Sequence, residues 1–226
     1  MSTYFNVPFT RFIGDLHLKK IAIVSVAGVM KKGYVPSEDQ EFVLIPSDTP
    51  ASELTLILRN INPSILNGDL NVLFPVDRLW ELKEDGEIAG PTKNHISVLG
   101  FHLLQSRVRK EIAPEIAEAL EAEDAGVVLL LSGSIFWNRI ATGIQHVVEE
   151  WGIPTVAITQ HPTVTRMGHP PRAFCPVGLR PGHAVGLPNQ PEMQRQIIME
   201  ALNLLNTVEE PGLVVEKSYS DYALVD

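Results

Sequence analysis

The sequence is poor in cysteine, in basic residues and in long hydrophobic runs, and each shortage excludes a class of protein. Its 226 residues include one cysteine, Cys175, so neither an intrachain disulfide nor dithiol chemistry within the chain can occur. The 18 lysines and arginines are outnumbered by 27 aspartates and glutamates, and the resulting net charge of −9 disfavours nucleic acid and anionic membranes as partners. No apolar run approaches the ~20 residues of a membrane-spanning helix. We therefore expect a cytoplasmic protein.

Short apolar runs separated by amphipathic segments indicate the fold class. Strands are predicted at residues 21–26, 41–45, 127–131 and 154–159. Helices are predicted at about residues 76–85, 114–124, 138–151 and 192–207. Apolar runs without polar alternation are typical of parallel strands covered on both faces. The pattern predicts a three-layer α/β fold, with a doubly wound, mostly parallel sheet and covering helices.

The domain organisation follows from the same pattern. We expect a single α/β domain over residues 1–226, with its core at 20–210. Residues 160–188, rich in proline and glycine, are predicted to form a long loop on the active-site side, and residues 211–226 a C-terminal tail. Because ligands of such folds bind outside the carboxyl ends of the strands, the loop beginning at residue 132 is a candidate site.

Four residues outside the long loop are candidates for chemistry. Ser134 lies where a strand leads into a helix, so it and nearby N–H groups can hold an anion or simply cap the helix. It lacks the G-x-S-x-G setting of a hydrolase nucleophile. His95 is either an acid/base or a hydrogen-bonded structural residue. The pair Asp77 and Arg78 opens a helix, where an acid is favoured whatever its function.

The predicted loop at 160–188 gathers further candidates. Arg172 can form a bidentate pair with a substrate carboxylate, or the loop can brace a subunit contact. His161, His169 and His183 are candidate metal ligands, although their spacing matches no zinc pattern. Cys175 is predicted to be a small buried residue rather than a reactive thiolate.

Six ordered blocks of sequence carry a family resemblance. They read 45-IPSDTP-50, 69-DLNVLFPVDRL-79, 94-NHISVLG-100, 114-PEIAEAL-120, 145-QHVVEEWGIPTVAIT-159 and 170-PPRAF-174. Over about residues 7–215 the chain resembles the selenoprotein B family of glycine, sarcosine, betaine and D-proline reductases, most of all its D-proline reductase branch. The resemblance implies a selenocysteine directly after the central strand and a cysteine three residues later. It also implies a separate pyruvoyl-bearing partner subunit, so no cofactor is expected in this chain.

The two chalcogen positions of the resemblance are occupied here by Ser134 and Trp137. In the family the selenolate attacks the carbon that bears the nitrogen, and the thiol resolves the selenium adduct. A serine hydroxyl is too hard and too weakly acidic for this step. Ser134 is either native or a replacement for selenocysteine, and the missing cysteine at 137 argues against replacement. Beside Trp137, the resemblance carries over as substrate-binding or scaffold positions Asp48, Asn71, Asp77, Arg78, His95, Gly133 and Arg172.

The leading hypothesis is a divergent, non-selenium relative of these reductase subunits. It would bind a small amino-acid-like or carboxylate ligand, with His95 as acid/base if it is catalytic, Ser134 near the anion and Arg172 orienting it. Two alternatives stay open: a non-catalytic scaffold or regulatory subunit of a reductase-like complex, and a metal- or histidine-assisted lyase or hydrolase. A homo-oligomer or a hetero-complex with a reductase-type subunit is expected.

Overall fold

A central sheet lies between two helical layers. The structure is a computed structural model that describes residues 6–57, 63–99, 105–132 and 137–219. The sheet contains β1 (Lys20–Ser25), β3 (Phe42–Pro46), β5 (Gly90–Pro91), β6 (Asn94–Val98), β7 (Val127–Leu131), β8 (Thr155–Ile158), β9 (Arg172–Val177) and β10 (Leu213–Ser218). Its order is β10-β9-β8-β7-β1-β6-β3, with β5 also paired to β1. Every pairing is parallel except that of β3 with β6.

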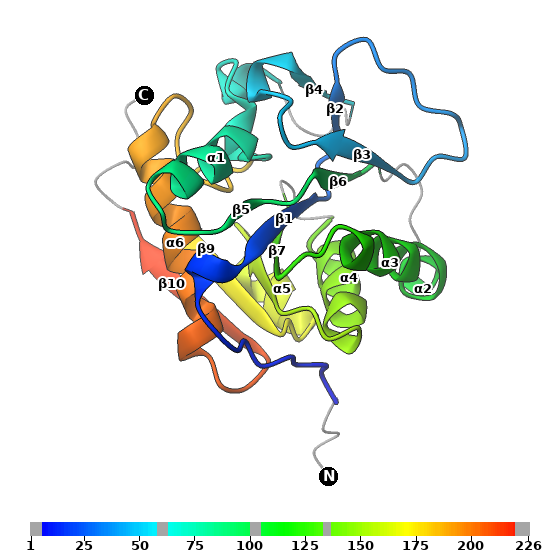
Figure 1. Cartoon of the computed structure of the whole chain (residues 1–226), viewed down its shortest axis with the longest axis vertical. Coiled ribbons are helices and arrows are strands. Elements are labelled where there is room, and N and C mark those ends of the chain that lie inside the picture. The colour runs from blue at the N-terminus through cyan, green and yellow to red at the C-terminus, as the bar shows by residue number, and fades with distance from the viewer. Residues whose placement is uncertain (1–5, 58–62, 100–104, 133–136, 220–226) are drawn as a thin grey trace.

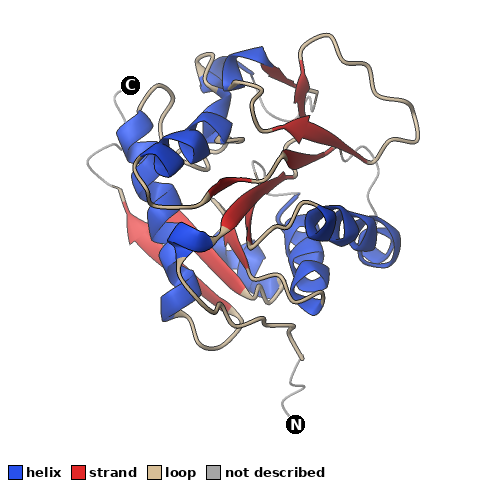
Figure 2. Ribbon diagram, in the orientation of Figure 1, coloured by secondary structure: helices blue, strands red, loops and turns tan. Residues whose placement is uncertain are grey.

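Helices cover both faces of this sheet (Figures 1 and 2). The α- and π-helical elements are α1 (Val76–Glu84), α2 (Gln105–Arg107), the π-helix η5 (Val108–Ile112), α3 (Ala113–Ala122), α4 (Asn138–Glu150), α5 (Pro162–Met167) and α6 (Pro191–Thr207). Short 3-10 turns are η1 (Leu16–Leu18), η2 (Ala51–Glu53), η3 (Pro63–Leu66) and η4 (Leu70–Val72), and β2 (Val29–Lys31) pairs with β4 (Leu54–Leu56) in a separate ribbon. The predicted three-layer α/β class is confirmed.

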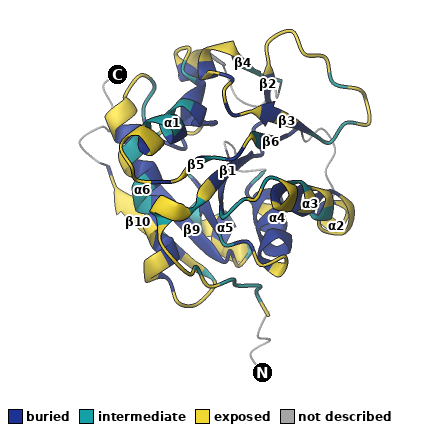
Figure 3. Cartoon of the chain, in the orientation of Figure 1, coloured by how far each residue is buried: buried dark blue, intermediate teal, exposed yellow. Residues whose placement is uncertain are grey.

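Alternation along the central strands builds the two cores. In β1, Ile21 and Ile23 pack under α1 and α6, whereas Ala22 and Val24 pack under α3 and α4. All five residues of β7 are buried, and they divide between the two faces in the same way. The central strands are accordingly dark in Figure 3. In the part of the chain that is described, no helix is both long and apolar enough to cross a membrane.

Two predicted segments are wrong. The expected loop at 160–188 contains α5 and the inner strand β9, and the expected tail at 211–226 contains β10, which pairs with β9 over its whole length. Proline hid β9 in the sequence. The Phe174 carbonyl accepts a hydrogen bond from Thr159 N, so the backbone groups of Phe174 point toward β8. The backbone of Pro176, two residues later, points the same way, but β8 has already ended there. Its missing N–H therefore removes no ladder hydrogen bond.

Candidate functional site

The carboxyl ends of β7 and β8 carry a buried polar cluster. Ser132 and Thr159 directly follow these strands, Asn138 begins α4, and Thr165 lies on α5. All four are buried, with 1–2 % of their surface exposed. Asn138 Oδ1 accepts hydrogen bonds from Ser132 Oγ and, at 2.8 Å, from Thr159 Oγ1. The Thr159 and Thr165 hydroxyls also share a hydrogen bond of 2.8 Å. This cluster fixes the start of α4 against the ends of β7 and β8.

Trp137 supplies a free hydrogen-bond donor beside this cluster. Its ring packs against the apolar core on the α4 face, and the indole Nε1 is buried. In the described part of the chain this N–H has no partner. A buried donor without an acceptor costs about 1–3 kcal/mol. Gly133 and Ser134, both predicted site residues, lie outside the described residues.

His95 lies inside the sheet rather than at its edge. β5 pairs with the first residues of β1 and β6 with the last, and this leaves a break opposite Ile23. His95 Nδ1 fills the break by accepting a hydrogen bond from Ile23 N at 3.2 Å, and its ring stands edge-on to Phe74. The side chain is completely buried, and burial lowers its pKa to about 3. A neutral imidazole without solvent contact fits the other prediction for His95, that of a hydrogen-bonded structural residue. The predicted acid/base role finds no support.

Arg172 lies at the opposite edge of the sheet from the polar cluster. It is the first residue of β9, and its Nη1 donates to Glu149 Oε1 at 2.9 Å, while Nη2 donates to the carbonyl of Thr10 at 2.6 Å. The same Glu149 oxygen accepts from the backbone N and the hydroxyl of Thr155, the first residue of β8. Parallel strands begin at one edge, so Arg172 does not reach the loop at 132–138. The ligand-orienting role predicted for it there is wrong.

Three predicted residues do come together near the start of α1. Asn71 Nδ2 donates to Asp77 Oδ2 at 2.8 Å, and Asn71 Oδ1 accepts from Asp77 N. Asn71, Asp77 and Arg78 line a hollow of about 380 Å³. Arg78 Nη1 also donates a hydrogen bond to Gln194 Oε1 of α6 at 3.3 Å. The fourth predicted residue, Asp48, is exposed in the turn after β3 and is not among the residues that line this hollow.

Asp69 joins the same hollow, and the sequence analysis missed it. Although burial acts to raise the pKa of Asp69, hydrogen bonds from Gln194, Asn189 and Asn71 lower it overall. Both carboxylate oxygens accept from these donors, and both oxygens of Asp77 are likewise bonded. Such a satisfied network ties the 69–78 segment to the start of α6. The signal was present in the sequence as Asp-x-Asn, which is typical of a capped turn.

The three candidate metal ligands do not form a metal site. His161 precedes α5, His169 follows it, and His183 lies in the loop before α6. His146 of α4 donates through Nε2 to the His169 carbonyl at 2.7 Å. All these histidines are described, and no group of three or more His, Cys, Asp or Glu side chains among the described residues is arranged to hold a metal ion.

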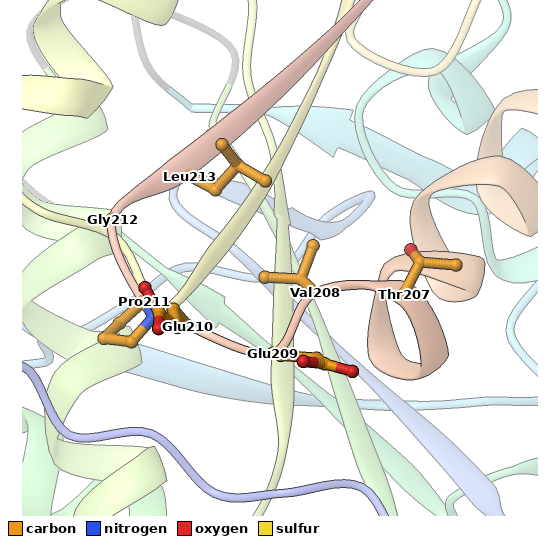
Figure 4. A pocket seen from close by; sticks show the side chains of 7 residues that line it. All are labelled: Thr207, Val208, Glu209, Glu210, Pro211, Gly212 and Leu213. Atoms are coloured by element: carbon orange, nitrogen blue, oxygen red, sulfur yellow. The ribbon is translucent and has the colours of Figure 1, made fainter.

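A larger hollow, of about 500 Å³, lies at the connection between α6 and β10 (Figure 4). Seven consecutive residues, 207–213, line it, and two of them are the glutamates Glu209 and Glu210. The hollow is therefore the concave side of one turn, and it is not formed between separate elements. None of the predicted site residues belongs to it.

Comparison with curated proteins decides the family. The gamma subunit of D-proline reductase from Acetoanaerobium sticklandii is 32% identical over 221 residues, which cover 96% of this chain and 90% of that protein. The chain belongs to the selenoprotein B family of reductase subunits. Two further members are glycine reductase complex component B gamma subunits, from Symbiobacterium thermophilum and Peptoclostridium acidaminophilum, each 26% identical over 96% and 97% of this chain. The chain spans about half of these two proteins, 53% and 52%.

No family model matches the chain, and no solved structure matches it. Within the selenoprotein B family the remaining question is the chalcogen centre. The one thiol of this member, Cys175, is buried on β9 and faces the α4 side of the sheet. Burial first, and then the carboxylate of Glu216, raises the pKa of this thiol to about 11. The predicted inert character of Cys175 fits this environment, because the thiolate is the reactive form.

Proposed function

We propose that this chain is a subunit of a reductase-type complex that binds a small amino-acid-like or carboxylate ligand at the carboxyl edge of its sheet. It does not perform selenol-based reductive C–N cleavage by itself. The observation that carries this is the set of residues at the chalcogen positions. They are Ser134 and Trp137, and the one thiol of the chain is a buried Cys175 with a raised pKa.

Two features at the strand ends support ligand binding there. The indole N–H of Trp137 is buried without a partner among the described residues, and α4 begins one residue later. The positive end of a helix dipole favours a carboxylate. The cluster around Asn138 holds this end of α4 rigidly against β7 and β8. A carboxylate that accepts from the Trp137 indole N–H at this end of α4 would satisfy the orphaned donor.

The loss of the reductase step is tested by assay. Wild-type chain, mixed with a pyruvoyl-bearing reductase subunit, D-proline and a dithiol, is expected to give no reductive ring opening. The same assay on a variant with cysteine at both positions, Ser134→Cys with Trp137→Cys, asks whether the scaffold regains turnover. Robust turnover by the wild type would overturn the proposal, whatever the variant does.

Ligand binding has a separate test. Calorimetric titration of wild-type chain with D-proline, glycine and simple carboxylates is expected to show saturable binding of at least one. Trp137→Phe removes the N–H and keeps most of the ring, so the ligand should bind more weakly while the melting temperature holds. Trp151→Phe is the matched control, because Trp151 lies at the far end of α4 and is 43% exposed. Equal weakening by both variants would contradict the site.

A scaffold role is the second candidate, favoured by one observation. The three relatives are all gamma subunits, of a reductase or of a reductase complex component. A chain that enters a hetero-complex but binds none of the ligands above would act through its contacts. The pyruvoyl group would then belong to the partner. The metal-assisted alternative has no support among the described residues.

A further inference from the structure

A small cationic cavity lies on the outer side of α4, between that helix and the α2–η5 segment. It has a volume of about 160 Å³ and is lined mainly by Ser106, Arg109, Arg139, Thr142, Gly143 and His146. None of its lining residues is acidic, although the chain as a whole carries a net charge of −9. Arginines from two separate elements, η5 and α4, therefore line one hollow of an acidic protein.

The charges in this cavity are poorly neutralised by the protein itself. Among the described residues, Arg109 pairs with Glu150 alone, whose Oε1 lies 4.0 Å from Arg109 Nη2, at the outer limit of an ion pair. Arg139 is exposed and forms no ion pair within the described ranges. Burial, and then the charge of Arg109, lowers the pKa of His146, while its hydrogen bond to the His169 carbonyl opposes this. The positive charge is therefore that of the two guanidinium groups.

The local backbone is arranged to keep the cavity open. Arg109 belongs to the π-helical turn η5, and single π turns within helices are frequent at functional sites. Its stem lies over Gly143, where an added Cβ would come within 3.5 Å of Arg109 Cγ. Glycine is among the least favourable residues inside a helix, so its place in the middle of α4 requires a reason other than helix stability. The space that it leaves is the floor of this cavity.

We propose that this cavity binds a compact tetrahedral oxyanion of the phosphate class, held between the Arg109 and Arg139 guanidinium groups. Guanidinium forks bind phosphate oxygens in pairs, and the hydroxyl of Ser106 adds a neutral donor. The volume corresponds to about five water molecules of ~30 Å³, too little for a drug-sized ligand of ~300–1,000 Å³. The site lies one helical turn from the polar cluster, since Thr142 Oγ1 donates to the Asn138 carbonyl at 3.0 Å.

Titration with inorganic phosphate at constant ionic strength tests the site. Wild-type chain is expected to bind one phosphate, and Arg139→Gln and Arg109→Gln are each expected to weaken binding about tenfold or more, as loss of a charge-assisted hydrogen bond does. Lys110→Gln is the matched control, because it removes one positive charge from the same π turn but does not line the cavity. Less than a twofold change is expected there.

Two further measurements separate the cavity from general charge effects. Gly143→Ala places a methyl group on the cavity floor at ordinary contact distance, so it should fold at least as well as wild type and bind phosphate more weakly. A phosphate monoester such as glycerol phosphate, titrated in parallel, shows whether the site takes free phosphate or a phosphorylated ligand. Absence of saturable binding by both, or equal weakening by Lys110→Gln, would overturn the proposal.

Discussion

At the scale of single residues, Arg172 shows that a side chain suited to binding a carboxylate ligand equally suits a buried ion pair. Its partner Glu149 is 3% exposed, and burial raises the Glu149 pKa while the Thr155 hydroxyl and Arg172 lower it. We expect Arg172→Met to reduce the free energy of unfolding by about 3–5 kcal/mol, because it leaves a buried carboxylate without its cation.

Urea denaturation of the isolated chain measures this loss. Lys20→Met is the control, because Lys20 pairs with Asp124 at the surface at 3.0 Å, and removal of an exposed pair costs less than about 1 kcal/mol. Equal losses in the two variants would show that the Arg172 pair does not stabilise the fold. In either variant the affinity for a ligand at the carboxyl edge should stay unchanged.

His95 gives the protein a defined response to acid. Burial lowers the folded-state pKa from 6.5 to about 3, so below pH 6.5 the unfolded chain binds a proton that the folded chain refuses. The stabilising contribution of the neutral ring is therefore present above pH 6.5 and falls as the pH drops toward 3. Between about pH 7 and about pH 5 we expect wild type to lose about 2 kcal/mol from this group.

The variant His95→Gln keeps an acceptor for Ile23 N and does not titrate. Its unfolding free energy, measured by urea denaturation at both pH values, should fall less steeply than that of wild type. His17→Gln is the control for replacing a histidine as such, since the His17 side chain is 56% exposed. A slope that is unchanged in His95→Gln would mean that His95 is already charged or accessible in the folded chain.

At the scale of elements, the central strands β1, β7 and β8 and the edge strand β3 were predictable from the sequence, whereas the inner strand β9 and the edge strand β10 were not. The strands β1, β7 and β8 are mostly apolar and do not alternate with polar residues, because helices pack on each side of them. In β10 only Val214 is buried, while Leu213, Glu216 and Lys217 are exposed, a pattern that suits an edge strand and also resembles a tail. In β9 a proline concealed the strand, and only its position relative to β8 explains why it is tolerated.

The packing of β10 can be tested by two neighbouring substitutions. Val214→Ala removes two methyl groups from the core on the α4 face, so we expect a loss of about 1–2 kcal/mol in unfolding free energy. Leu213 is 50% exposed, and Leu213→Ala should cost less than about 0.5 kcal/mol. Thermal unfolding of both variants measures the difference. A free tail would give the same small effect at both positions.

At the scale of the whole molecule, residues that were predicted to share one site lie at different places along the sheet. Arg172 with Thr10 lies at the amino edge, His95 in the middle, and Ser132 with Trp137 at the carboxyl edge. A resemblance at one position does not tell a ligand contact from a structural residue, and Arg172 belongs to a buried ion pair with Glu149. The Arg172 environment joins residues 162 positions apart, so no local pattern reveals it.

The two core clusters of the chain lead to an expectation about its assembly. If the chain is a complex subunit, as its relatives are, its fold is complete before a partner binds, because the two core clusters close within the chain. Native mass spectrometry should then show a folded species for the chain alone and a heavier hetero-complex when a pyruvoyl-bearing reductase subunit is added. The D-proline reductase gamma subunit is the positive control. If that control assembles while this chain keeps its unbound mass, the hetero-complex is wrong and a homo-oligomer or a free binding protein is left.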